Sequence, residues 1–161
     1  MKIAQQTKAV EKWPDLEQVT DPLISVFTPS LNHAHFLRDT IRSVANQSFR
    51  KIEHIVIDGG STDETCDILA QYPHVRWTSE KEGHIVEAYQ KGFARARGKY
   101  IIQCCVSDGV LDQDWFQRCF DVLEANQDVS LVWGIPQYMS EDGRLLGTSF
   151  PHFFEAPPPQ K

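Results

Sequence analysis

The chain has 161 residues, of which 41% are hydrophobic and 24% charged, and its formal net charge is −6. This length and composition fit one globular domain with a core of its own. The negative charge argues against a nucleic-acid binder, which needs clustered Lys and Arg, but a divalent cation could still bring in a phosphate-bearing small ligand. No apolar run approaches the ~20 residues that span a bilayer, and the polar amino terminus is unlike a secretory signal.

The four cysteines, Cys66, Cys104, Cys105 and Cys119, form no CxxC pair. No Cys/His spacing matches a zinc site. We therefore expect reduced structural thiols and a cytoplasmic location.

Strands and helices are expected to alternate along the chain. After a polar arm over 1–22, the expected strands cover 24–28, 52–57, 75–77, 100–105 and 129–133. Four helices are expected. The first begins after a cap at Asn32, the second and third cover about 62–71 and about 83–97, and the fourth begins after a cap at Asp112 or Asp114. Residues 138–148 resemble a hairpin that turns at 141–143, and 151–161 form a proline-rich tail.

This alternation predicts a three-layer α/β/α sandwich with a mostly parallel sheet, over residues 23–150. The strand at 100–105 is almost fully apolar, which favours a central place in the sheet. Right-handed crossovers would bring residues 29–32, 58–61 and 107–109 to one edge of the sheet. Ligands of open α/β sheets bind at such an edge.

Asp58 ends a β-branched strand and is followed by Gly59, Gly60 and a Ser-Thr-Asp run that can cap a helix. The pattern is typical of a nucleotide site, in which Asp58 contacts the ligand. Asp58 could instead cap the following helix. Asp108, which precedes Gly109, could be a turn residue that contacts no ligand. His33, His35 and His84 lie near the same edge and are also explained as surface residues.

Five segments, in this order, resemble family 2 glycosyltransferases. Residues 24–32 (ISVFTPSLN) are similar to the opening VSVIIPTYN of that family, and 43–49 (SVANQSF) to its SVxxQTY segment. Residues 53–63 (EHIVIDGGSTD) are similar to its ExIVIDGGSTD, and the residues from Gly83 to Ile101 follow its glycine and alanine spacing. The stretch at 105–109 (CVSDG) stands where members carry Asp-x-Asp or Asn-Ser-Asp-Asp. The likeness covers about residues 23–135.

The resemblance implies a nucleotide-diphospho-sugar transferase (GT-A-like) fold and sugar transfer from an activated donor, with inversion. The donor would be linked to UDP, GDP or dTDP, and the acceptor would be a saccharide, a lipid-linked group or a protein. The resemblance also implies a role in cell-envelope polysaccharide synthesis. The donor-binding residues that it implies are Pro29, Ser30, Leu31, Asn32, Asp58, Gly59, Gly60, Glu80, Gly83, Ser107 and Asp108.

Three positions depart from the family pattern. Leu31 replaces a Tyr, Gly59 replaces a second Asp, and Ser107 replaces an acid, so Asp108 is the one anionic metal ligand expected in its loop. A Mg²⁺ or Mn²⁺ ion that bridges a diphosphate needs only one or two carboxylates. We therefore expect metal binding at Asp108.

The family's general base lies in a second half of the enzyme, and we assign no catalytic residue here. The chain is expected to carry mainly the donor-binding half. One alternative is a non-catalytic nucleotide-sugar-binding or interaction domain. Another is a nucleotidyltransferase or dinucleotide-binding domain, against which the lack of GxGxxG and GxxxxGK[ST] motifs counts.

Overall fold

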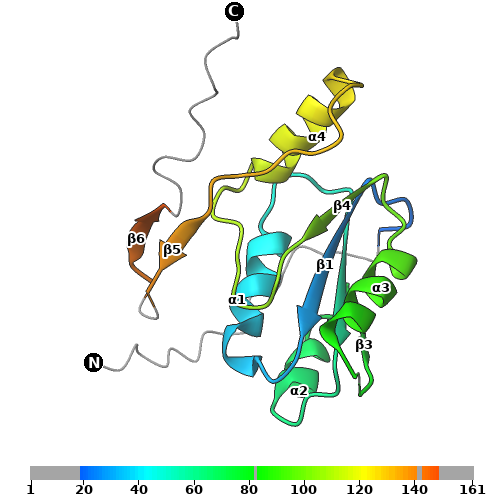
Figure 1. Ribbon diagram of the computed structural model, residues 1–161, viewed down its shortest axis with the longest axis vertical. Helices are drawn as coiled ribbons and strands as arrows, with labels where there is room; N and C mark the ends of the chain where they lie inside the picture. Colours follow the sequence, from blue (N-terminus) through cyan, green and yellow to red (C-terminus); the bar gives the residue numbers. More distant parts are fainter. Residues whose placement is uncertain (1–18, 82, 141–142, 149–161) are drawn as a thin grey trace, which may run out of the picture. The chain divides into compact units, whose positions relative to one another are not determined.

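The computed structural model describes residues 19–81, 83–140 and 143–148, and the chain forms two compact units, residues 1–117 and 118–161. The first unit holds four strands and three helices, and α4 runs from it into the second unit, which holds a hairpin (Figure 1). The elements are β1 (Ile24–Ser30), α1 (Ala34–Ala45), β2 (Ile52–Asp58), α2 (Thr65–Leu69), β3 (Val75–Ser79), α3 (Ile85–Arg95), β4 (Tyr100–Gln103), α4 (Trp115–Ala125), β5 (Gln137–Met139) and β6 (Leu145–Thr148).

The four strands of the first unit form one parallel sheet in the order β3-β2-β1-β4. Every residue of β1 is buried, and so is β2 after Ile52, because both strands have neighbours on each side and helices on each face. The prediction that the strand near 100–105 is central is wrong for the described sheet. There β4 lies at the edge, and the Ile101 side chain is exposed.

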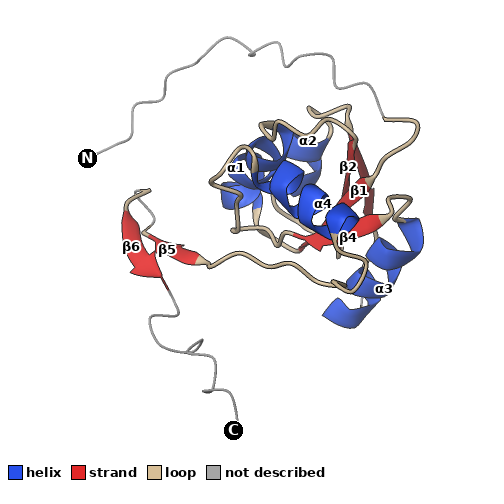
Figure 2. Cartoon of the chain, turned by 90° about the horizontal axis from the view of Figure 1, so that it is seen from above, coloured by secondary structure: helices blue, strands red, loops and turns tan. Residues whose placement is uncertain are grey.

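Helices cover both faces of this sheet, which confirms the three-layer α/β/α arrangement (Figure 2). On one face, Leu37 and Ile41 of α1 and Leu69 of α2 pack with Val56 of β2. On the other face, Phe27, Ile55 and Ile57 pack with Ala88 of α3. Successive residues of β2 thus enter opposite cores, as strand geometry requires.

The second unit differs more from expectation. The segment 129–133 was expected to be a strand, but its residues pair with no strand in the described part of the chain. A strand forms only where another strand pairs with it, and a local hydrophobic pattern does not reveal whether such a partner is present. The hairpin prediction is confirmed by antiparallel β5 and β6, and the turn residues Glu141 and Asp142 lie outside the described residues. No described helix combines the length and the hydropathy needed to cross a membrane.

Most of residues 1–22 and all of 151–161, expected as an arm and a tail, also lie outside the described residues. The expected boundaries 1–22, 23–150 and 151–161 therefore stay a prediction.

Candidate functional site

The carboxyl ends of β1, β2 and β3 meet at one edge of the sheet. The strand register sets Ser30 beside Asp58 and Asp58 beside Ser79. Beyond the strands, Gly59 N donates to Ser30 O (2.9 Å), and Glu80 N donates to Asp58 O (3.0 Å). The residues that follow all three strands are therefore joined by backbone hydrogen bonds into one continuous rim.

Asp58 is fully buried at the end of β2. Its Oδ2 accepts hydrogen bonds from Ser61 N (2.9 Å), Gly60 N (3.2 Å) and Ser79 Oγ (2.6 Å), and its Oδ1 accepts one from Ser61 Oγ. A carboxylate that accepts several backbone and hydroxyl donors fixes the loop around it. In this structure Asp58 shapes the loop 59–61, and its contact with a ligand stays a prediction.

The two glycines after Asp58 differ in what they require. Gly60 has φ +83°, and a Cβ there would lie 3.0 Å from the Lys81 Cα. A Cβ at Gly59 would make ordinary contact, at 3.5 Å, with Leu31 Cδ1. Position 60 thus requires glycine, because its φ is positive and a Cβ would crowd the Lys81 backbone, whereas position 59 could hold a larger side chain.

Asn32 adopts a left-handed conformation (φ 54°) and connects the first two loops. Its N–H donates to Ser61 Oγ (2.7 Å), and its Oδ1 accepts from Thr62 N (2.8 Å). The prediction that Asn32 caps α1 is therefore wrong, because its side chain is held by the neighbouring loop. Asp63 Oδ2 binds the N–H of Ala34 instead (3.0 Å), and hydrogen bonds from Thr65 and Ala34 hold the pKa of Asp63 below its usual value.

The capping prediction for the second helix is also wrong. Ser61 and Thr62 were expected to cap it, but α2 begins later, after Glu64, whose side chain makes no capping hydrogen bond. The side chains of Ser61 and Thr62 bind Asp58 and Asn32 instead. Asp63 Oδ2 accepts from Ala34 N of α1, and its Oδ1 accepts from the N–H of Thr65 (3.1 Å), the first residue of α2.

Beside Asn32, Leu31 is half exposed at the rim (51%), whereas Pro29 is buried within β1. An exposed leucine next to a side-chain-free glycine offers an apolar surface on which a flat ring can pack.

Glu80 and Gly83 follow β3 along the same rim. Glu80 Oε2 accepts a hydrogen bond from Lys91 Nζ of α3 (2.7 Å), and this cation lowers the pKa of Glu80. Gly83 N donates to Glu87 Oε2 (3.3 Å), and His84 caps α3 by accepting from Val86 N. Glu80 is thus beside the Asp58 loop, and Gly83 lies at the start of α3.

Asp108 stands in the loop after β4. Cys104 N continues the pairing with β1 by donating to Phe27 O (3.0 Å), and Thr40 Oγ1 of α1 donates to Asp108 O (2.8 Å). The loop turns at Ser107, which has φ +86°, and both Ser107 and Asp108 are exposed. The backbone of Asp108 is therefore anchored to α1 while the residue itself is open to solvent.

The donor set of this loop is small. Among the described residues no group of three or more His, Cys, Asp or Glu side chains could hold a metal ion. One exposed carboxylate fits a hard cation whose other ligands are phosphate oxygens and water. Asp108 is thus suited to share a metal with a bound diphosphate, and unsuited to hold one alone.

Two features of the rim escape sequence reasoning. Ser79 binds the Asp58 carboxylate, and the signal that could have found it is its place at the end of the neighbouring strand. Gln103 Nε2 donates to Tyr89 Oη (2.5 Å) and to Cys105 Sγ (2.9 Å). Because Gln103 bonds both Tyr89 and Cys105, α3 contributes a hydroxyl beside the loop that follows β4. Burial, with added repulsion from Cys105 and Asp108, raises the pKa of Tyr89.

Known proteins share this sequence pattern and fold. The family model described as "Glycosyl transferase family 2" matches residues 25–159. The putative teichuronic acid biosynthesis glycosyltransferase TuaG of Bacillus subtilis is 43% identical over 86 residues, which are 50% of this chain and 34% of TuaG. Chondroitin synthase of Escherichia coli is 29% identical over 133 residues, which are 80% of this chain and 19% of the synthase. The chain thus spans about a third or less of these two relatives.

Solved structures agree on the fold. The structure of S. aureus TarS 1-349 in complex with UDP has a TM-score of 0.60 at 16% identity, covering 75% of this chain and 43% of that one. The mannosyltransferase PcManGT from Pyrobaculum calidifontis, in complex with GDP-Man and Mn²⁺, has a TM-score of 0.59 at 18% identity, covering 66% of this chain and 34% of that one. These likenesses confirm the expected GT-A-like fold. The match of the family model over residues 25–159 shows that the chain belongs to glycosyl transferase family 2.

Proposed function

We propose that this chain supplies the donor-binding part of a glycosyltransferase and binds a nucleotide-diphospho-sugar at the carboxyl edge of its sheet. The observation that carries the proposal is the hydrogen-bonded rim formed by 30–32, 58–62 and 79–81, in a chain that belongs to family 2. Such an edge is the ordinary ligand position of an open parallel sheet.

Each part of the rim has a proposed role. The nucleoside lies on Leu31 and Gly59, next to buried Pro29 and Ser30 at the end of β1, and exposed Leu31 offers an apolar contact for the base. Asp58 holds the loop, and the backbone of Gly59 and Gly60 lets the ligand approach closely. Glu80, Gly83, Asn32 and Ser107 border the same space.

The diphosphate lies near Asp108 in this proposal. Asp108 would supply the protein ligand to a Mg²⁺ or Mn²⁺ ion, which when bound neutralises charge on the leaving diphosphate. The neighbour PcManGT binds GDP-Man with Mn²⁺, and TarS has been solved with UDP and with UDP-GlcNAc, which supports a nucleotide-sugar donor.

The proposed reaction transfers the sugar to an acceptor hydroxyl. The hydroxyl oxygen forms a bond to the anomeric carbon, the bond from that carbon to the diphosphate breaks, and the hydroxyl proton passes to a carboxylate base, with inversion. The relatives named chondroitin synthase and putative teichuronic acid biosynthesis glycosyltransferase support a growing envelope glycan as the acceptor. The four free cysteines support a reducing, cytoplasmic setting.

A non-catalytic nucleotide-sugar-binding domain is the second candidate. It is favoured by the loop at 105–109, where Asp108 is the single acidic residue and Cys105 and Ser107 stand near it in place of further acids. Donor binding without transfer to any acceptor would favour this candidate over the enzyme.

Calorimetric titration with UDP-, GDP- and dTDP-sugars, each with and without Mn²⁺, tests the donor site. We expect saturable binding of one of them, tightened by Mn²⁺. In Asp108→Ala the metal-dependent part of the affinity should fall at least about tenfold, or 1.4 kcal/mol. Asp39→Ala, which removes an exposed carboxylate from α1, should leave binding unchanged. Failure to bind any of the three donors would disprove the assignment.

A further inference from the structure

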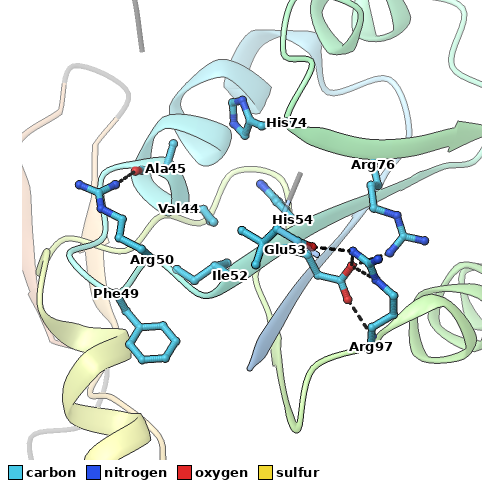
Figure 3. Close-up of a pocket in the computed structure, with 11 residues that line it drawn as sticks. Val44, Ala45, Phe49, Arg50, Ile52, Glu53, His54, His74, Arg76 and Arg97 are labelled. Carbon is cyan, nitrogen blue, oxygen red and sulfur yellow. Dashed lines mark hydrogen bonds and ion pairs between the residues drawn. The ribbon is translucent and has the colours of Figure 1, made fainter. Parts of the chain in front are cut away.

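A hollow that the donor site does not use lies at the opposite end of β2 (Figure 3). It begins at Ile52, Glu53 and His54, the first residues of that strand, and it is bounded by the residues after α1, including Phe49 and Arg50. Five residues of extended strand separate Glu53 from Asp58, or roughly 17 Å. The two places are thus too far apart for one small ligand to occupy both.

The polar side of this hollow is rich in arginine. Glu53 is buried and accepts hydrogen bonds from Arg97 Nε (2.9 Å) and from Arg76 Nη1, and Figure 3 shows both guanidinium groups turned toward it. Arg50 is exposed, and its hydrogen bond to Ala45 O is long at 3.5 Å. Arg76 and Arg97 share the Glu53 carboxylate on one side of the hollow, and Arg50 lies on the opposite side (Figure 3). Glu53 is the one acidic side chain among the described lining residues.

Two histidines line the hollow with unused ring nitrogens. His54 is 3% exposed, and its Nε2 shares a hydrogen bond with Thr28 Oγ1 (2.9 Å), but its Nδ1 has no partner among the described residues. His74 Nε2 is buried and also lacks a partner there. Burial lowers the pKa of both rings, so each is neutral near pH 7 and keeps one nitrogen able to donate or accept. Buried nitrogens of this kind are ordinarily satisfied by a ligand or an ordered water.

The remaining walls of the hollow are apolar. Val44, Ala45, Phe49 and Ile52 line it beside the arginines, so a charged and an apolar surface face one space. Guanidinium groups suit phosphate oxygens in geometry and charge, and an apolar wall suits a short hydrocarbon group.

We propose that this hollow is a second binding site, for a phosphate monoester that carries a small apolar group. The phosphate lies against Arg50, on the side of the hollow away from Arg76 and Arg97 (Figure 3), and the apolar group lies along Val44 and Phe49. An oxygen of the ligand, or a water that it orders, satisfies His54 and His74.

Titration of the 161-residue chain with hexyl phosphate, inorganic phosphate and hexanol tests the phosphate and the apolar group of the proposed ligand separately. We expect hexyl phosphate to bind at least about fivefold more tightly than inorganic phosphate, and hexanol not to bind. In a two-dimensional NMR spectrum the imidazole resonances of His54 and His74 should shift as hexyl phosphate saturates the site.

Arg50→Gln is the informative variant, because Arg50 makes no ion pair with Glu53 and its loss leaves that network intact. It should weaken hexyl phosphate binding at least about fivefold, whereas Arg38→Gln, on α1 and bonded to Gln71, should not. Donor binding at the other edge should be the same in both variants.

Several results would overturn this second site. The first is that hexyl phosphate shows no saturable binding, and the second is that Arg50→Gln and Arg38→Gln change its affinity equally. The third is that a nucleotide-sugar displaces bound hexyl phosphate. None of these results bears on the donor site, which is measured by its own titration.

Discussion

Asp58 and Glu53 are both buried acidic residues of β2, yet their partners differ in kind. Asp58 accepts from the neutral donors of its own loop and of Ser79, whereas Glu53 is bound by two arginines and by Ser25. Burial alone would raise the pKa of Glu53, but the hydrogen bonds of Ser25, Arg97 and Arg76 outweigh it and lower the pKa. Two acids of one strand therefore serve two unrelated local structures.

Replacing Asp58 tests its structural role. In Asp58→Asn one carboxylate oxygen becomes an NH₂ group, so donors of Ser61, Gly60 or Ser79 lose their acceptor. We expect the free energy of unfolding to fall by about 1–3 kcal/mol, together with donor affinity. Urea unfolding and donor titration measure the two effects, with the exposed Asp39→Asn as control. A variant as stable as the parent would show that the loop does not need this carboxylate.

His54 gives the protein a pH-dependent stability. Burial, with a smaller effect of His74, lowers the pKa of His54 to about 3 from the ordinary 6.5. Because the unfolded chain binds a proton that the folded state excludes, this stability is fully present above about pH 6.5 and is lost as the pH falls toward 3.

We expect the free energy of unfolding to decrease by on the order of 1.4 kcal/mol per pH unit below 6.5 because of His54. Urea unfolding between about pH 7 and pH 5 measures this slope, in a range where the carboxylates with lowered pKa values stay ionised. His54→Gln should flatten the slope, and the exposed His35→Gln should not. Equal slopes in all three proteins would contradict the assignment.

At the scale of elements, the buried parallel strands were the most predictable. The expected strands at 24–28 and 52–57 appear as β1 and β2, each longer by one or two residues, because their Ile, Val and Phe side chains suit a strand that helices cover on both faces. The short strand at 75–77 and the helix at 83–97 are also found, as β3 and α3.

The errors arise where the outcome depends on a neighbour. The apolar pattern of β4 indicated burial, but a strand's position in a sheet is set by pairing that no local pattern contains. At the site, the residues of the rim were predicted and their bonding was not. Asn32, Ser61 and Asp63 have the composition of helix caps, and in the structure they bind across loops that are about 29 residues apart in sequence.

Gly92 shows a packing constraint within α3. Alanine is ordinarily favoured over glycine in a helix by about 1 kcal/mol. A Cβ at Gly92, however, would lie 2.4 Å from Cδ2 of the fully buried Phe27 ring. We expect Gly92→Ala to lower the free energy of unfolding by about 1–3 kcal/mol, as measured by urea unfolding.

Gly109→Ala is the matched control for this change, since its Cβ would meet Ser43 at an ordinary 3.5 Å. It should change stability by less than about 0.5 kcal/mol. A Gly92→Ala variant that gains stability would mean that Phe27 can move aside.

At the scale of the whole molecule, the two units differ in how much of their structure is buried. In the first unit β1 is buried along its whole length. In the second, every described residue of β5 and β6 is exposed, including the large apolar side chains of Tyr138 and Leu146. A lone two-stranded hairpin is marginally stable in water.

Amide hydrogen exchange should reflect this difference. We expect the amides of β5 and β6 to exchange at the earliest times and those of β1 and β2 to be protected up to global unfolding. Mass spectrometry of peptides covering 137–148 and 24–30 compares them within one sample. Strong protection of the hairpin would show that it is covered in solution.

The loop that follows β2 has a further consequence for ligand entry. Gly60, Ser61 and Thr62 have hydrogen-bond partners within the protein itself. A preorganised loop spares the association step the entropy of ordering it. Stopped-flow mixing with a nucleotide-sugar should then give a single exponential phase whose rate rises linearly with ligand concentration, with no slower isomerisation after it.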